Sequence, residues 1–126
     1  MIITQSKPYG VIRSQLDKKD KIGLVTCNTC ARMCETGGEE QMKKLAERLK
    51  KDGFNVIDMD IIPVACNLDQ AKKPKYEGKT LIVLACEAGS YTLKRLFPKK
   101  NIIDATNTVG LCARDEEGNI FVVKKF

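Results

Sequence analysis

Residues 22–34 have the sequence Ile22-Gly-Leu-Val-Thr26-Cys27-Asn-Thr-Cys30-Ala-Arg-Met-Cys34, a short apolar run followed at once by three cysteines. A short apolar run of this kind is typical of a buried strand. In an open α/β sheet, ligands bind beyond the carboxyl ends of the strands. Thiolates bind soft metals. The stretch therefore predicts the central strand of an α/β sheet with a sulfur-rich site at its end.

Strand and helix patterns alternate along the rest of the chain. We expect further strands at residues 54–58, 80–85 and 102–105, and helices at residues 8–18, 41–51 and 90–97, with a short crossover helix from Leu68. This alternation is typical of a parallel α/β sheet. With right-handed crossovers, the four strands take the Rossmann-like order 2-1-3-4, mostly parallel, with flanking helices. The tail from Ala113 has the pattern of a C-terminal hairpin that turns at Gly118-Asn119.

Size and charge define the broad class of the protein. A length of 126 residues fits one domain, 1–126, with its own hydrophobic core. The net charge of +6 comes from scattered lysines without interleaved aromatic residues, so we expect no nucleic-acid partner. The N-terminal segment lacks the apolar core of a signal peptide, and no run approaches the length of a membrane span. We therefore expect a cytoplasmic protein without a membrane partner.

The helix expected at residues 41–51 has signals at both ends. Thr36-Gly-Gly-Glu39 fits the capping-box pattern, in which the two side chains satisfy free backbone amides. Asp52-Gly53 ends the helix with a residue suited to a left-handed cap. The helix therefore begins after Cys34, and residues 27–34 are expected to form a loop in front of its positive end.

The cysteines and the missing histidines restrict the chemistry. The chain has six cysteines and no histidine. Without a secretory signal, so many cysteines indicate metal binding or redox chemistry rather than a disulfide framework. Sites that need imidazole, including Ser–His and Cys–His catalysis, are excluded. All-sulfur zinc, an iron–sulfur centre, disulfides and redox thiols remain.

Three thiols within residues 27–34 indicate one bound group, because such a loop can wrap a metal centre while a distant cysteine supplies the fourth ligand. We expect four ligands and one replacement, should a ligand drop out: Cys27, Cys30, Cys34 and Cys66, and then Cys86. In the predicted strand order, the strands that end at Cys27 and Cys86 are neighbours. Cys112 is not expected to be a ligand.

The spacing leaves three functional classes open. A 4Fe–4S cluster and a zinc ion held by four thiolates both suit these cysteines, and zinc would make the chain a structural assembly module. A Cys-x-x-Cys redox pair usually has its second cysteine within the start of a helix, whereas Cys30 is expected in a loop. Gly37-Gly38 lacks the Lys-Ser or Lys-Thr end of a phosphate loop, so nucleotide binding is not expected.

Several motifs occur together in an order that resembles a known family. They are Met1-Ile-Ile-Thr-Gln-Ser-Lys-Pro8, Cys27-x-x-Cys30-x-x-x-Cys34-x-x-Gly37-Gly38-Glu39, the single Cys66, Leu84-Ala-Cys86-Glu-Ala-Gly89, and Asn107-Thr108 before Gly110 and Arg114. Over nearly its whole length the chain resembles the methylenetetrahydrofolate reductase C-terminal family. Its members are subunits or extensions paired with a flavin-containing methylenetetrahydrofolate reductase in anaerobes that use the acetyl-CoA pathway.

The resemblance implies a role in one-carbon metabolism. It implies an iron–sulfur, electron-transferring accessory subunit, with zinc as the alternative metal, and it matches five cysteines to those of the family: Cys27, Cys30, Cys34, Cys66 and Cys86. The chain shows no catalytic motif of its own, so the reductase chemistry would belong to the flavin-containing partner. We expect that partner to dock on the loops at residues 34–38, 67–69 and 87–90.

Overall fold

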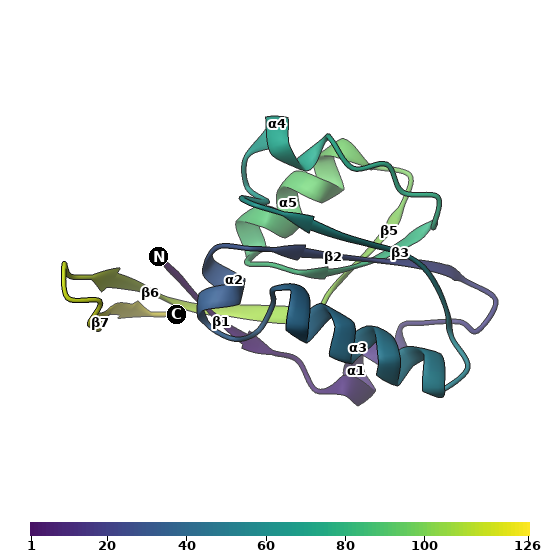
Figure 1. Ribbon diagram of the computed structural model, residues 1–126, viewed down its shortest axis with the longest axis horizontal. Coiled ribbons are helices and arrows are strands. Elements are labelled where there is room, and N and C mark those ends of the chain that lie inside the picture. The colour runs from purple at the N-terminus through teal and green to yellow at the C-terminus, as the bar shows by residue number, and fades with distance from the viewer.

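The computed structural model describes residues 1–126 as an α/β fold with two sheets (Figure 1). The strands are β1 (Ile2–Ser6), β2 (Lys21–Cys27), β3 (Asn55–Ile62), β4 (Thr80–Leu84), β5 (Asn101–Asp104), β6 (Thr106–Arg114) and β7 (Ile120–Lys125). The helices are α1 (Tyr9–Ser14), α2 (Cys30–Met33), α3 (Glu39–Lys51), α4 (Leu68–Ala71) and α5 (Glu87–Leu96). None of these helices has the length and apolar composition needed to cross a bilayer.

The first sheet is parallel, with the strand order β3-β2-β4-β5. Its four strands are those predicted from the sequence, and this order corresponds to 2-1-3-4 when they alone are numbered. Strand β2 is central: Val25 pairs with Asp60 of β3 on one side and with Val83 of β4 on the other. Six of the seven residues of β2 and all five of β4 are buried, which explains their almost continuous apolar sequences.

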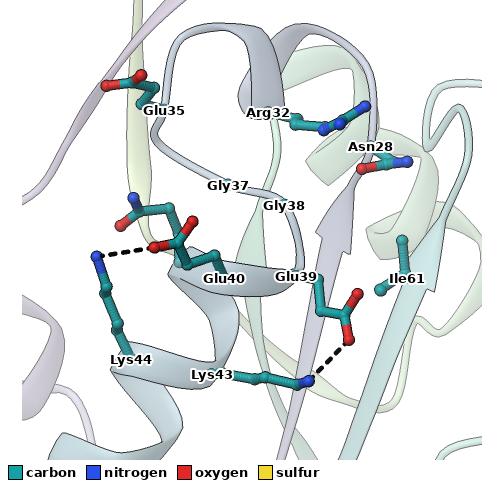
Figure 2. A pocket seen from close by; sticks show the side chains of 11 residues that line it. Asn28, Arg32, Glu35, Gly37, Gly38, Glu39, Glu40, Lys43, Lys44 and Ile61 are labelled. Carbon is teal, nitrogen blue, oxygen red and sulfur yellow. Dashed lines mark ion pairs between the residues drawn. The ribbon is translucent and has the colours of Figure 1, made fainter.

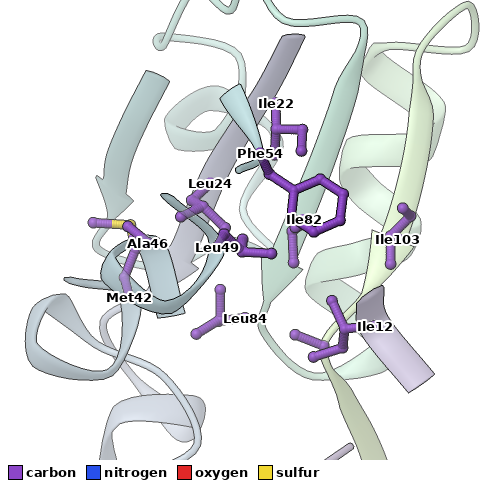
Figure 3. Packing of buried hydrophobic residues seen from close by; sticks show 11 residues of the cluster. Ile12, Ile22, Leu24, Met42, Ala46, Leu49, Phe54, Ile82, Leu84 and Ile103 are labelled. Atoms are coloured by element: carbon purple, nitrogen blue, oxygen red, sulfur yellow. The ribbon is translucent and has the colours of Figure 1, made fainter. Parts of the chain in front are cut away.

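Side chains of β2 and β4 alternate between two hydrophobic cores, one on each face of the sheet. The core under α1 and α3 joins strand residues to helix residues: Leu24, Ile82, Leu84, Ile12 and Leu49 (Figure 3). The core on the opposite face is built from Val25, Val83, Ala31, Ala71 and Leu93. Burial of one large aliphatic side chain contributes about 1.5–3 kcal/mol. Because both faces are covered in this way, the carboxyl ends of the strands are held in fixed positions.

The second sheet is antiparallel and has the order β1-β6-β7. Gly110 of β6 pairs with Ile3 of β1 on one side and with Lys125 of β7 on the other. Residues 115–119 join β6 to β7, and Gly118 in this turn has a φ of +87°. The sequence analysis placed no strand at β1 and made the first helix too long, since α1 covers only Tyr9–Ser14.

Ala105 connects the two sheets. It is the only residue between β5 and β6. Its N–H donates to the Val83 carbonyl of the parallel sheet at 2.9 Å, and its own carbonyl accepts from the Lys7 N–H, just beyond β1, at 2.9 Å. The second sheet is therefore a direct continuation of the edge strand of the first.

The start of α3 differs from the predicted capping box. The N-cap residue is Gly38, with a φ of +91°, and no side chain caps the helix. Thr36 is instead buried, and its hydroxyl lies 2.6 Å from that of Thr4 in β1 and donates to the Ala31 carbonyl at 3.2 Å. The end of the helix is as predicted, because Gly53 takes a φ of +90° after the C-cap residue.

The buried hydroxyl of Thr26 links three segments at the carboxyl edge of the parallel sheet. It accepts a hydrogen bond from the Gly38 N–H at 2.6 Å and donates one to the Leu84 carbonyl at 3.1 Å. Gly37 fits there because it has no Cβ, which would lie 2.7 Å from the Thr26 Oγ1 atom and 2.9 Å from the Leu84 carbonyl. The start of α3 is thereby held against the ends of β2 and β4.

We expect Thr26→Val to lower the free energy of unfolding by about 1–3 kcal/mol, because the substitution keeps the shape but leaves the buried Gly38 N–H without an acceptor. Urea denaturation measures the change. Thr92→Val is the matched control, since that hydroxyl only donates to the Ala88 carbonyl of its own helix. Thr92→Val should lower the free energy of unfolding by less than about 1 kcal/mol. Equal losses in the two variants would contradict this role for Thr26.

Candidate thiol site

Cysteines lie beyond the carboxyl ends of three neighbouring parallel strands. Cys27 is the last residue of β2, and Cys86 is the N-cap residue of α5, directly after β4. Cys66 follows β3 within the connection to α4. The order β3-β2-β4 brings these strand ends together at one edge of the sheet. Cys30 reaches the same region because only two residues separate it from Cys27.

Cys27 is the buried anchor of this region. It is 5% exposed, and its Sγ atom accepts a hydrogen bond from the Ala65 N–H at 3.4 Å. Thr29 fixes the same neighbourhood by donating from its hydroxyl to the Pro63 carbonyl at 2.5 Å. These bonds tie the segment that carries Cys66 to the segment that carries Cys27 and Cys30.

The pKa of the Cys66 thiol is affected by three other cysteines. Partial burial is the main cause that raises the pKa of the Cys66 thiol, and negative charge on Cys86, Cys27 and Cys30 raises it further, in that order of size. A like charge has this effect only when it lies near the titrating group. Cys86, Cys27 and Cys30 are therefore near enough to Cys66 to affect its ionisation, without forming a preformed metal site.

Cys34 and Cys112 have different surroundings. The Cys34 thiol donates to the Ile2 carbonyl of β1 at 3.6 Å. Cys112 is buried in β6, where its carbonyl accepts from the N-terminal ammonium of Met1 at 2.8 Å. Neither contributes to the raised pKa of Cys66. Four of the five cysteines predicted to bind a cofactor thus follow or end neighbouring strands at one edge of the parallel sheet, and Cys34 lies toward the second sheet.

The prediction that residues 27–34 form a loop is wrong in one respect. Cys30 is the first residue of the one-turn helix α2, which packs against β1 and β2. Ala31 of this helix is completely buried in the second core, and that burial accounts for the helical turn. A second cysteine at the start of a helix is typical of redox pairs, so the sequence argument against such a pair does not hold.

All six cysteines are free thiols. No three cysteine, aspartate or glutamate side chains are already arranged to hold a metal ion. Four thiolates around zinc, at Zn–S distances of about 2.3 Å, would have sulfur atoms about 3.8 Å apart. A 4Fe–4S cluster is larger and keeps its four sulfur ligands farther apart. The thiols have the right chemistry for either centre, and binding requires their side chains to close around it.

An open apolar pocket adjoins the thiols. Cys66 and Cys86 line it together with Ile2, Tyr91 and Phe126, and its volume is about 500 Å³. Sequence reasoning missed these three neighbours because Ile2 belongs to β1, which was not predicted, and Phe126 follows a hairpin whose position beside the thiols was not predicted. Only Tyr91 carried a signal, since it belongs to the helix that follows Cys86.

A larger polar pocket of about 810 Å³ lies at the start of α3 (Figure 2). Carboxylates occupy this positive helix end, and two of them pair with lysines one turn later: Glu39 with Lys43 at 2.8 Å and Glu40 with Lys44 at 3.4 Å. The pocket is lined by both signs of charge, because Arg32, Lys43 and Lys44 lie there beside the carboxylates. That Gly37-Gly38 is not a phosphate loop stays a prediction from the sequence.

Comparisons with known proteins do not add to this geometry. No protein-family model, curated protein or solved structure matches the chain. The function is therefore argued from the thiols and from the sequence motifs themselves.

In the reduced, metal-free protein, we expect the pH midpoint of Cys66 alkylation by iodoacetamide to lie above that of Cys66 in the urea-unfolded chain. A raised thiol pKa means that the reactive thiolate forms only at higher pH. Cys86→Ser should lower the midpoint, because it removes the negative charge that raises the pKa of Cys66 most, and Cys112→Ser should leave it unchanged. Peptide mass spectrometry reads the modification. An unchanged midpoint in Cys86→Ser would show that the two thiols are not neighbours.

Proposed function

We propose that the chain binds a 4Fe–4S cluster through Cys27, Cys30, Cys66 and Cys86 and acts as an electron-transferring accessory subunit. The observation that supports the proposal is that these cysteines end or follow three neighbouring strands, β3, β2 and β4, at the carboxyl edge of the parallel sheet. In a Rossmann-like sheet the ligand lies where the winding reverses. Here that point falls between β2 and β4, the strands that lead to Cys27 and Cys86.

The surroundings of the thiols favour a negatively charged cofactor. Cys86 is the N-cap residue of α5, so it lies at the positive end of a ten-residue helix. Free amides and the positive end of a helix stabilise thiolates. The cluster would supply one-electron transfer, while the chain's own residues hold the sulfur ligands on rigid strand ends. A reducing compartment such as the cytoplasm would keep these thiols available.

The resemblance supplies the metabolic context. It supports pairing with a flavin-containing methylenetetrahydrofolate reductase, whose flavin would carry the substrate chemistry. The chain itself offers no histidine for acid–base catalysis. We therefore infer a non-catalytic subunit of an oxidoreductase complex, with zinc in the same four-thiol site as the alternative metal. Zinc would give an assembly module without a redox role.

One observation favours a second candidate, a thiol-redox protein. Cys30 is the first residue of α2, and two residues separate it from Cys27, as in a Cys-x-x-Cys pair. Such a protein would be metal-free after anaerobic purification and would reduce the disulfides of insulin. A cluster protein would be brown, and a zinc protein would be colourless.

We expect the anaerobically purified chain to contain about four iron and four sulfide ions. Serine replacement of Cys27, Cys30, Cys66 or Cys86 should each remove most of this content, because one ligand is lost. Cys34→Ser and Cys112→Ser are the matched controls and should retain it. Iron and sulfide analysis with visible absorbance gives the readout. If Cys34→Ser loses the cluster and Cys86→Ser retains it, then Cys34 and not Cys86 is the fourth ligand.

We further expect the loaded chain to form a complex with a flavin-containing methylenetetrahydrofolate reductase and to exchange electrons with its flavin. Docking should use the loops at residues 34–38, 67–69 and 87–90. Leu68→Glu should weaken the complex at least about tenfold, since this leucine is 43% exposed at the start of α4. Val11→Glu, an equally exposed apolar residue on α1, is the control. Size-exclusion chromatography and flavin absorbance measure both effects, and failure of both with wild type would exclude the electron-transfer role.

A further inference from the structure

Strands β6 and β7 form an arm that extends away from the body of the molecule (Figure 1). Every residue of β7 is exposed. Its apolar side chains are 52–66% exposed: Ile120, Phe121, Val122 and Val123. Adjacent residues of a strand point to opposite faces, so both faces of the arm carry uncovered apolar side chains. A two-stranded hairpin of this kind is only marginally stable in water by itself.

Strand β7 is also an edge strand. It pairs with β6 on one side and with no strand on the other. Its outer backbone N–H and C=O groups are therefore available to another strand. An edge with exposed apolar residues on both faces is suited to an added strand, which would supply main-chain hydrogen bonds and cover side chains at once.

Charges are separated along the arm. The turn at its tip contains Asp115, Glu116 and Glu117, whereas Lys124 and Lys125 lie at the other end of β7. None of these five side chains forms an ion pair within the chain. Asp115 bonds to the turn itself, through the N–H groups of Glu117 and Asn119. Arg114, the last residue of β6, adds one positive charge at the tip, so the tip is net acidic while the two lysines lie at the base.

We propose that the occupant of this edge is a second copy of the same chain, with the two β7 strands antiparallel about a twofold axis near Val122. Antiparallel pairing reverses the second strand, so the acidic tip of each arm lies beside the lysines of the other. The apolar residues meet at the centre. The two three-stranded sheets then become one six-stranded sheet, and the interface is self-complementary, as a twofold axis requires.

The charge pattern distinguishes this partner from others. Lysines and bulges on an edge strand usually oppose pairing, and β7 has both, since Val123 has no partner in the β6–β7 register. In the twofold arrangement the lysines of one copy lie beside the acidic turn of the other, which removes that repulsion. The inference does not depend on the thiol site, because none of the four grouped cysteines belongs to the arm.

The test uses two charge-reversed full-length proteins, one with Lys124→Glu and Lys125→Glu, the other with Glu116→Lys and Glu117→Lys. Each variant alone places like charges together at both ends of the interface and should be monomeric. An equimolar mixture restores opposite charges and should form a heterodimer at least about tenfold tighter than either homodimer. Sedimentation equilibrium measures the dissociation constants of the two variant homodimers and of the heterodimer. Added salt should weaken the wild-type dimer and the heterodimer alike.

Val122→Lys should also dissociate the wild-type dimer, whereas Val11→Lys, a similarly exposed valine on α1, should not. Thermal unfolding by circular dichroism establishes that each variant is folded. Wild type that stays monomeric up to about 1 mM, beyond the range of even weak specific interfaces, would overturn the proposal. The proposal would also be overturned if the two charge-reversed variants failed to associate when mixed, or if the wild type stayed monomeric and its Val122 contacted a different protein.

Discussion

The hydrogen bonds of Thr26 are the constraint on which the carboxyl edge of this molecule depends. One buried hydroxyl binds the end of β4 and the first turn of α3 while its backbone continues the central strand into Cys27. The chain returns to this hydroxyl only because Gly37 has no side chain in the way. A Val at position 26 would suit the strand equally well, but it would remove the hydrogen bonds that join the start of α3 to the ends of β2 and β4.

The thiol site follows from strand order more than from local spacing. Cys27 and Cys30 are close because they are neighbours in sequence, whereas Cys66 and Cys86 join them only because β3 and β4 flank β2. The hydrophobic cores on the two faces of the sheet fix those positions. A cofactor held there would be supported by strand ends that cannot move without disrupting both cores.

The parallel sheet could be predicted because its signals are local. Leu24 and Val25 lie within an apolar run that only a doubly covered strand explains. Strand β1 carried no comparable signal, since it exists only through pairing with β6, a hundred or more positions away. The same non-local contact misled the capping prediction, because Thr36 bonds to Thr4 of β1 instead of capping α3. The position of Cys34 near Ile2 depends on that unpredicted strand as well.

The single residue Ala105 between β5 and β6 sets which side chains of β6 face the interior. Side chains alternate along a strand with a period of two, and one residue joins β5 to β6. One added residue at this joint would turn Cys112 from the interior to solvent, while the contact between Gly110 and the Lys124 carbonyl, which is internal to the β6–β7 hairpin, would stay as it is. Two added residues would preserve the faces and change only the reach of the arm. Insertions of an odd number of residues at this joint should therefore be tolerated less well than insertions of an even number.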